Sequence, residues 1–186
     1  EKFGIKKLSD DLYNLMVKRV YDICACTNVI VYLNEKKINC NGLQTYVNYY
    51  FDEKVEKVHE YIDNRWEVVV IVGDYDQISF VNGVNTIKGG KHVDHVSGTI
   101  TRKLAAIVKT KGYKRKKMTL KQTLIKDNMI VFVRSVIENP AFDSQIKEYL
   151  TTPVAKFGSK FDISDKFIDK LMKTSLIERA IALSNF

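Results

Sequence analysis

The sequence Met129-Ile-Val-Phe-Val-Arg-Ser-Val-Ile137, followed by Glu138-Asn-Pro-Ala-Phe-Asp-Ser-Gln-Ile-Lys-Glu148, decides the prediction of the fold. The first stretch is apolar, rich in β-branched residues and free of Gly and Pro, which is typical of a buried strand. Pro140 has no backbone N–H to donate and therefore ends strand pairing. The polar residues that follow favour turns and caps. We therefore predict a buried strand that delivers a polar loop to one end of a sheet.

The loop carries a candidate phosphate-binding pair, Gln145 and Lys147. A Lys supplies a full positive charge and up to three donors, and a Gln amide can orient a water or an oxyanion. A single Lys on a polar loop is nevertheless most often only solvated. The residue types alone leave a phosphate contact and a solvated loop both open.

The pattern Glu-Asn-Pro-x-Phe-Asp-Ser-Gln-x-Lys in residues 138–147 resembles the transducer signature of eukaryotic-type DNA topoisomerase II, a type IIA enzyme. The resemblance implies that this loop reaches into a neighbouring ATPase domain. Lys147 would then be the catalytic contact to the γ-phosphate of ATP, and Gln145, Ile146 and Lys147 would form the cofactor-binding set. Ile146 stands where the family has a Thr, so a role for that hydroxyl is not carried over.

A second motif is Lys88-Gly-Gly-Lys-His-Val-Asp94. Its two glycines permit a tight backbone entering a helix. Such a turn could cradle a phosphate at the helix N-terminus or allow close contact between helix and strand. The motif resembles the family's Lys-Gly-Gly-Arg-His-Val-Asp, a structural signature at the turn from sheet to helix, which favours the structural interpretation. The resemblance extends from about Leu8 to Ala182.

Hydrophobic periodicity predicts an α+β fold. The order β-β-α-α-β suggests a sheet of three or four strands with helices on one face. We expect the long strand His59–Val72 to form a hairpin with Gln77–Asn82. The remaining predicted elements are helices at Asp10–Tyr21, Leu43–Phe51, Lys91–Lys109, Thr119–Lys126 and two after Ser164, and a hairpin at 29–38.

The family resemblance implies a more specific fold and division of the chain. It implies the ribosomal-protein-like transducer fold, a small, mainly antiparallel sheet with helices on one face and a left-handed β-α-β crossover. Residues 1–52 would be the C-terminal end of a GHKL ATPase domain, and residues 53–186 the transducer domain, whose last helices lead to the DNA-cleavage core. ATP with Mg²⁺ would be bound mainly by the upstream ATPase domain, so we expect this chain alone to be inactive.

Positive charge is concentrated in one segment. The net charge is +8, but residues 102–126 contain ten Lys or Arg and no Asp or Glu. The rest of the chain contains 20 basic and 22 acidic residues. A local basic block favours a polyanionic partner, although a solvated loop or a nuclear localisation signal would have the same composition. In the family, a lysine-rich loop at this position contacts the transported DNA duplex. The candidate DNA-binding residues are Lys109, Thr110, Lys111, Lys114, Arg115, Lys116 and Lys117.

The three cysteines, Cys24, Cys26 and Cys40, lack the spacing of a zinc site and are expected to be reduced structural thiols. His92 and His95 share a helical face but lack a third ligand, so we predict no metal site. No apolar run approaches the roughly 20 residues that cross a bilayer. We therefore expect the nucleus or cytoplasm, including a viral factory if the source is a large DNA virus.

The function predicted from the resemblance is part of an ATP-dependent type IIA topoisomerase that passes one DNA duplex through another. This region would couple the binding and hydrolysis of ATP to movement of the DNA gate. We expect a homodimer in the full-length enzyme and a monomer for this segment. Two alternatives stay open: a non-enzymatic nucleic-acid-binding module, and the transducer of another GHKL ATPase such as a mismatch-repair protein.

Overall fold

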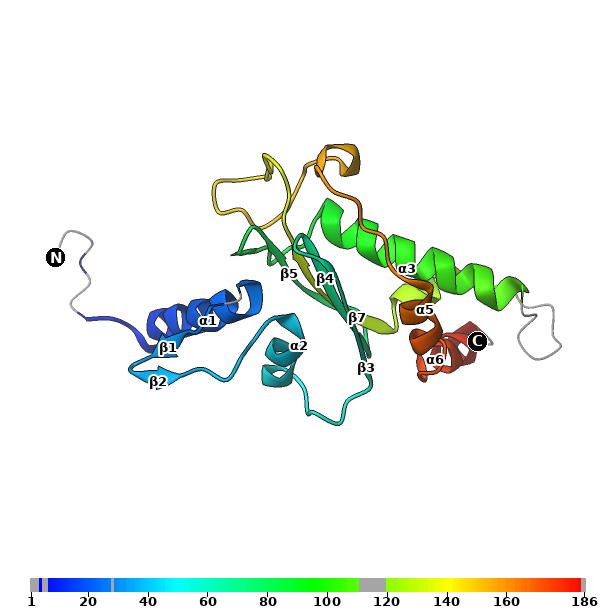
Figure 1. Ribbon diagram of the computed structural model, residues 1–186, viewed down its shortest axis with the longest axis horizontal. Coiled ribbons are helices and arrows are strands. Elements are labelled where there is room, and N and C mark those ends of the chain that lie inside the picture. Colours follow the sequence, from blue (N-terminus) through cyan, green and yellow to red (C-terminus); the bar gives the residue numbers. More distant parts are fainter. Residues whose placement is uncertain (1–3, 5–6, 28, 111–119, 185–186) are drawn as a thin grey trace.

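The computed structural model describes residues 4, 7–27, 29–110 and 120–184. A sheet of five strands lies at its centre, in the order β3-β4-β7-β5-β6 (Figure 1). The strands are β3 (Lys57–Asp63), β4 (Trp66–Val72), β5 (Asp76–Val81), β6 (Val84–Asn85) and β7 (Met129–Ser135). The predicted α+β class is confirmed.

The predicted buried strand, β7, is the middle of the sheet. Phe132 faces Val69 in the antiparallel pair with β4 and Ile78 in the parallel pair with β5. Parallel neighbours need a crossover connection, and here it runs through α3 (Lys91–Thr110) and α4 (Gln122–Lys126). This is the β-α-β crossover that the resemblance implied, and its hand stays a prediction.

The prediction of one long strand over His59–Val72 is wrong. Asp63 ends β3, and its Oδ1 accepts hydrogen bonds from the backbone N–H of Arg65 at 2.7 Å and of Trp66 at 2.8 Å. This Asx-type turn folds the chain back, so β3 and β4 form the hairpin. This split and the additional short strand β6 give the sheet five strands instead of three or four.

The predicted hairpin between the Val68–Val72 region and Gln77–Asn82 is also wrong, because β7 lies between β4 and β5. The connection after β4 bonds to the start of β7 instead. Gly73 N–H donates to Asn128 O and Tyr75 N–H to Asp127 O, both at 3.0 Å. Proximity in sequence was thus a poor guide to pairing, because the inserted strand comes from more than fifty residues downstream.

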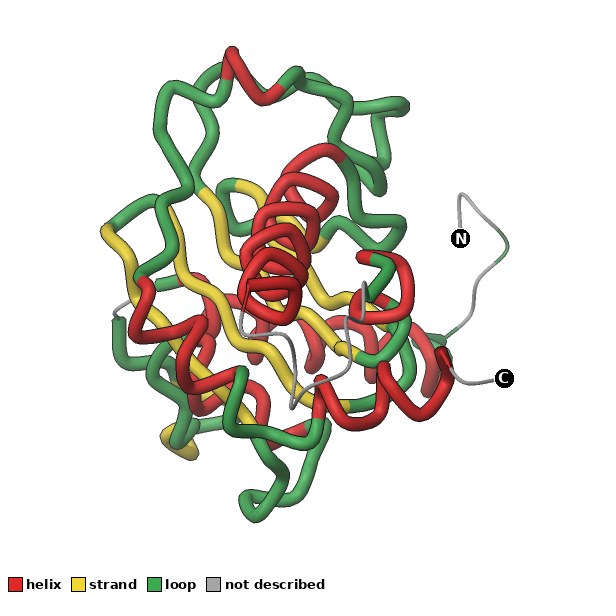
Figure 2. Tube along the Cα trace, turned by 90° about the vertical axis from the view of Figure 1, so that its right-hand side faces the viewer, coloured by secondary structure: helices red, strands yellow, loops and turns green. Residues whose placement is uncertain are grey.

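Helices cover both faces of the sheet (Figure 2). The helices after residue 52 lie on one face, as predicted, and those before it, α1 (Asp10–Cys26) and α2 (Leu43–Tyr46), cover the opposite face. The domain boundary at 52/53 stays a prediction. Covering the first face are α3, α4, α5 (Asp165–Leu171) and α6 (Leu176–Ser184).

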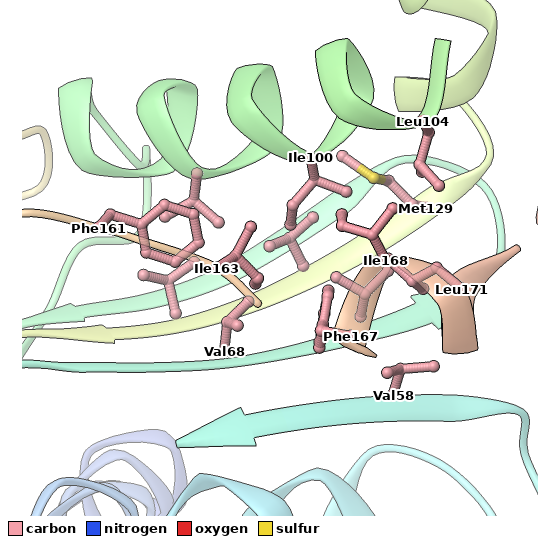
Figure 3. Close-up of a cluster of buried hydrophobic side chains, with 14 of the residues drawn as sticks. Val58, Val68, Ile100, Leu104, Met129, Phe161, Ile163, Phe167, Ile168 and Leu171 are labelled. Atoms are coloured by element: carbon pink, nitrogen blue, oxygen red, sulfur yellow. The ribbon is translucent and has the colours of Figure 1, made fainter. Parts of the chain in front are cut away.

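Strand residues alternate between the two cores, as the pleat requires. Val131 and Val133 of β7 join the core under α3, whereas Phe132 joins the core under α2. Figure 3 shows Ile100 and Leu104 of α3 directed at the first of these cores. All five side chains are fully buried. Burying one side chain of this kind stabilises the folded state by about 1.5–3 kcal/mol relative to leaving it exposed.

The N-terminal elements follow the prediction with different lengths. Ser9 caps α1 by accepting from Leu12 N–H at 3.3 Å, and the helix continues to Cys26 instead of ending at Tyr21. The predicted helix over Leu43–Phe51 is one α-turn followed by the 3₁₀ turn η1 (Val47–Tyr49). The predicted hairpin is short, with β1 (Tyr32–Leu33) paired to β2 (Lys36–Lys37).

Two C-terminal elements complete the fold. The 3₁₀ turn η3 (Val154–Lys156) precedes α5, whose N-cap, Ser164, accepts from Phe167 N–H at 3.1 Å. Within the described ranges, no helix combines the length and apolar character needed to cross a membrane.

A buried polar cluster joins α2 to the sheet. Glu67 on β4 is only 5% exposed and accepts from Arg134 Nε at 3.0 Å and from Leu43 N–H at 3.2 Å. Its Oε1 lies 2.9 Å from His59 Nε2. Burial alone would raise the pKa of Glu67, but the hydrogen bonds and charges of His59 and Arg134 outweigh it and hold the pKa below its usual value.

We expect Glu67→Gln to lower the free energy of unfolding at pH 7 by about 1–3 kcal/mol, because it removes the buried charge that the Arg134 guanidinium is arranged to meet. A depressed carboxyl pKa stabilises the fold fully above the ordinary glutamate pKa of about 4.3, and this contribution is lost as pH falls through the lower folded-state pKa. The difference between variant and parent should therefore shrink below about pH 4. Urea unfolding across pH 3–7 measures it.

Glu53→Gln is the matched control for this prediction, because Glu53 is exposed. It should leave the pH dependence unchanged. An equal gap between parent and Glu67→Gln at pH 3 and pH 7 would contradict the assigned role of the Glu67 carboxylate.

Candidate functional site

The segment that follows β7, here called the switch loop (residues 138–152), is a narrow hairpin closed by its own hydrogen bonds. Ala141 N–H donates to Thr152 Oγ1 at 2.7 Å, and Thr151 N–H donates to Ala141 O at 2.9 Å. Nearer the tip, Asp143 N–H donates to Tyr149 O at 3.1 Å. The two arms are therefore held together along their length, and Figure 1 shows the loop, in yellow, projecting from the sheet.

The base of the switch loop is fixed to neighbouring elements. The side chain of Asn82, at the end of β5, accepts from Ile137 N–H at 2.8 Å and donates to Ile137 O at 2.9 Å. Glu138 N–H donates to Phe157 O at 3.1 Å, and the Glu138 carboxylate lies 2.9 Å from Arg65 Nη2. The loop thus leaves the sheet in a defined direction.

The tip carries the three residues predicted as the cofactor-binding set. Gln145, Ile146 and Lys147 are all exposed, and Ile146 is 76% exposed. The Lys147 N–H donates to Ser144 O at 3.1 Å, and Lys147 itself has a φ of 63°, a left-handed conformation that side-chain-bearing residues seldom adopt. Strained backbone conformations of this kind cluster at active sites, ligand clamps and switch regions.

The Lys147 ammonium is available to an anion. Its Nζ lies 5.9 Å from the centre of the Phe142 ring, and among the described residues it forms no ion pair. A point charge on a flexible stem, beside the exposed amide of Gln145, can meet the oxygens of a phosphate. In the described ranges no three His, Cys, Asp or Glu side chains gather to hold a metal ion.

The second predicted surface is only partly described. Lys109 and Thr110 end α3 and are exposed, and the Thr110 hydroxyl bonds to the Ala106 carbonyl at 3.0 Å. Five predicted DNA-binding residues lie outside the described residues: Lys111, Lys114, Arg115, Lys116 and Lys117. A helix of 20 residues is about 30 Å long, so this surface begins far from the start of α3.

The two histidines in the first turns of α3, His92 and His95, have different surroundings. His92 is fully buried, its Nε2 lies 3.2 Å from Thr86 Oγ1, and burial lowers its pKa to about 3. His95 packs against the edges of Phe157 and Phe161. His92 therefore belongs to the packing of the turn, and His95 borders a cleft of about 640 Å³ beside the segment 154–162.

The cysteines are free thiols, as predicted. Cys24 and Cys40 are buried in the core under α1 and α2. Burial raises the pKa of Cys26 to about 12, which keeps this thiol protonated.

Sequence reasoning missed the contacts that hold the switch loop. Neither the Thr152 hydroxyl nor the pair between Lys88 Nζ and Glu148 Oε2, at 2.6 Å, has a sequence signature. Gly89 and Gly90 indicated a close approach of two backbones, but the sequence did not show which segment approaches them. In the structure Gly90 lies against Leu150 of the switch loop.

Comparison with known proteins fits this geometry. The family model described as DNA gyrase B matches residues 28–184. The chain belongs to the DNA gyrase B family. It is 44% identical to DNA topoisomerase 2 of Acanthamoeba polyphaga mimivirus, over 98% of this chain and 15% of the relative, and 38% identical to DNA topoisomerase 2 of Saccharomyces cerevisiae, over 99% and 14%.

Solved structures agree with the sequence relatives. The ATPase region of Saccharomyces cerevisiae topoisomerase II superposes with a TM-score of 0.86 at 38% identity, covering all of this chain and 48% of that one. The ATPase and transducer domains of DNA topoisomerase II from Balamuthia mandrillaris superpose with a TM-score of 0.87 at 32% identity, over 98% and 46%.

The chain therefore corresponds to part of the ATPase region of a type IIA topoisomerase. It spans about a seventh of the length of these curated relatives and about half of the solved chains. The two alternatives, a stand-alone nucleic-acid-binding module and a mismatch-repair transducer, are not favoured.

Proposed function

We propose that this chain is the coupling segment of an ATP-dependent topoisomerase that passes one DNA duplex through another. Residues 1–52 end the ATPase domain and residues 53–186 form the transducer. Lys147 contacts the γ-phosphate of ATP held by the upstream domain, and Gln145 and Ile146 complete the cofactor-binding set. The observation that carries the proposal is the exposed Lys147 ammonium at the strained tip of a loop whose base and arms are fixed.

Charge stabilisation at the phosphate is the chemistry that Lys147 supplies. Negative charge on the transferred phosphoryl group is spread over its oxygens, and a positioned cation lowers the barrier without accepting a covalent bond. ATP enters with Mg²⁺, and both are proposed to be bound mainly by the upstream ATPase domain. Ile146 presents an apolar surface, which suits a protein contact at the same docking event.

Coupling follows from the dependence of this contact on docking. Lys147 meets the phosphate only when the two domains are together, so ATP favours the docked arrangement and loss of the phosphate removes that preference. A ligand that interacts with only one of two arrangements shifts the equilibrium between them. The switch loop is continuous with β7, so the signal enters the centre of the sheet.

The basic segment at the end of α3 is proposed as a DNA contact. The proposal rests on its charge and on the likeness to topoisomerases, and it includes Lys109, Thr110, Lys111, Lys114, Arg115, Lys116 and Lys117. Contacts of this kind act on phosphates and are independent of base sequence. The full-length protein is proposed to act as a homodimer on double-stranded DNA in the nucleus or cytoplasm.

We expect Lys147→Ala to reduce the ATP turnover number of the full-length protein at least tenfold with little change in KM for ATP. The reason is that the lost charge interaction strengthens in the transition state, while the nucleotide is held by other residues. Steady-state ATP hydrolysis together with nucleotide binding measures both parameters.

Lys173→Ala serves as the matched control, because Lys173 is also an exposed lysine but lies after α5, outside the switch loop. It should hydrolyse ATP at the parent rate. An unchanged turnover number for Lys147→Ala would remove the proposed phosphate contact, and the chain would then be better explained as a DNA-binding scaffold.

Replacing Lys114, Arg115, Lys116 and Lys117 by Gln should weaken duplex binding, because each lost phosphate contact removes about 0.9 from the slope of log K against log salt. Loss of all four phosphate contacts should therefore reduce the magnitude of this slope by about 3.6. Fluorescence anisotropy with duplexes of unrelated sequence, at 50–200 mM salt, measures it.

A variant with Lys156, Lys160, Lys166 and Lys173 replaced by Gln has the same net charge and is the control. It should keep most of the slope. Equal losses in the two variants would show that net charge, and no local DNA contact, governs binding.

A further inference from the structure

The last part of the switch loop, residues 148–152, runs beside the turn that begins α3. Lys88 N–H donates to Glu148 O at 2.9 Å, Leu150 N–H donates to Gly89 O at 3.1 Å, and Lys91 N–H donates to Leu150 O at 3.0 Å. The Lys88 ammonium adds an ion pair to the Glu148 carboxylate at 2.6 Å. Three main-chain bonds and one ion pair thus tie the residues next to the loop tip to residues 88–91, which lead into α3.

Gly90 is the residue that allows this approach. It has a φ of 140°, and a Cβ built on it would lie 2.5 Å from the nitrogen, 2.6 Å from the oxygen and 2.8 Å from the Cα of Leu150. These are backbone atoms, and the Leu150 side chain is fully buried, so Leu150 has little freedom to move aside. Any side chain at Gly90 must push the return arm of the loop away from α3.

The Lys88–Gly90 turn is fixed by a polar network that connects the residues just before it to β5 and α3. Gln77 Nε2 donates to Ile87 O at 2.8 Å, and the hydroxyls of Ser79 and Thr86 lie 2.6 Å apart. Thr86 Oγ1 also lies 3.2 Å from Nε2 of the buried His92. The turn is therefore fixed to β5 on one side and to α3 on the other, which makes it a firm support for the loop.

We propose that the Lys88–Gly90 turn positions Lys147 by holding the return arm of the switch loop against the start of α3. This inference rests on the proposed phosphate contact of Lys147. Gly90 and Lys88 are positioning residues, which act through the loop. The tie also joins the switch loop to α3, whose other end, Thr110, begins the basic segment.

The test compares Gly90→Ala with Gly83→Ala in the full-length protein. Gly83 also has a positive φ, 79°, but its Cβ would meet nothing within 4 Å, so the control has the backbone strain without the collision. For Gly90→Ala we expect the ATP turnover number to fall at least fivefold with KM within twofold of the parent. Amide hydrogen exchange in peptides covering 142–151 should be at least tenfold faster. Gly83→Ala should match the parent in all three.

The outcomes separate this inference from the proposed function. Parent-like turnover and exchange in Gly90→Ala, while Lys147→Ala is impaired, overturns the positioning role and leaves the phosphate contact standing. Faster exchange in Gly90→Ala, while Lys147→Ala turns over normally, overturns the phosphate contact and the positioning role built on it.

If Gly90→Ala does not fold, Lys88→Ala decides the question, because Lys88 is largely exposed and its backbone bond is retained. Loss of the ion pair should speed exchange in the 142–151 peptides at least threefold and lower turnover about twofold, and Lys88→Arg should restore both. Parent-like exchange in Lys88→Ala would overturn the inference.

Discussion

Strand β7 pairs with two different partners, and this pairing fixes the positions of both the sheet and the loop that follows it. β7 is antiparallel to β4 and parallel to β5, so it lies in the middle of the sheet with both faces covered. Only an apolar, β-branched strand can occupy that place without burying unpaired polar groups. Its one charged residue, Arg134, is satisfied by Glu67. Because β7 is fixed in this way, the loop that follows it leaves the sheet at a defined point.

The same constraint relates the two working surfaces. The switch loop follows β7, and the connection that brings the chain back to β7 contains α3 with the basic segment at its end. Because β5 and β7 are parallel, this connection has to cross one face of the sheet, and it thereby brings the first turn of α3 beside the return arm of the switch loop. A topological requirement thus places a proposed ATP contact and a proposed DNA contact at opposite ends of one helix.

The sequence was informative where a local pattern decides the structure. The apolar run ending at Ile137 predicted β7, hydrophobic periodicity over Lys91–Lys109 predicted α3, and the two helices expected after Ser164 are α5 and α6. Pairing order was not predictable, because no local pattern shows that β7 enters between β4 and β5. The break at Asp63 was missed because this turn contains no Gly or Pro. It is made by hydrogen bonds to the Asp63 side chain. The motif predicted the residues at the tip of the switch loop, whereas only the structure shows the contacts that hold the loop.

The most direct test of the central claim is a structure of the ATPase region that contains this segment, bound to a non-hydrolysable ATP analogue. The quantity to measure is the distance from Lys147 Nζ to the nearest γ-phosphate oxygen. If Lys147 contacts the γ-phosphate, the two atoms should form a charge-assisted hydrogen bond of about 2.7–3.2 Å, with the bonds between the loop and the start of α3 intact. A Lys147 ammonium more than about 6 Å from the phosphate in a docked, nucleotide-bound state would contradict it.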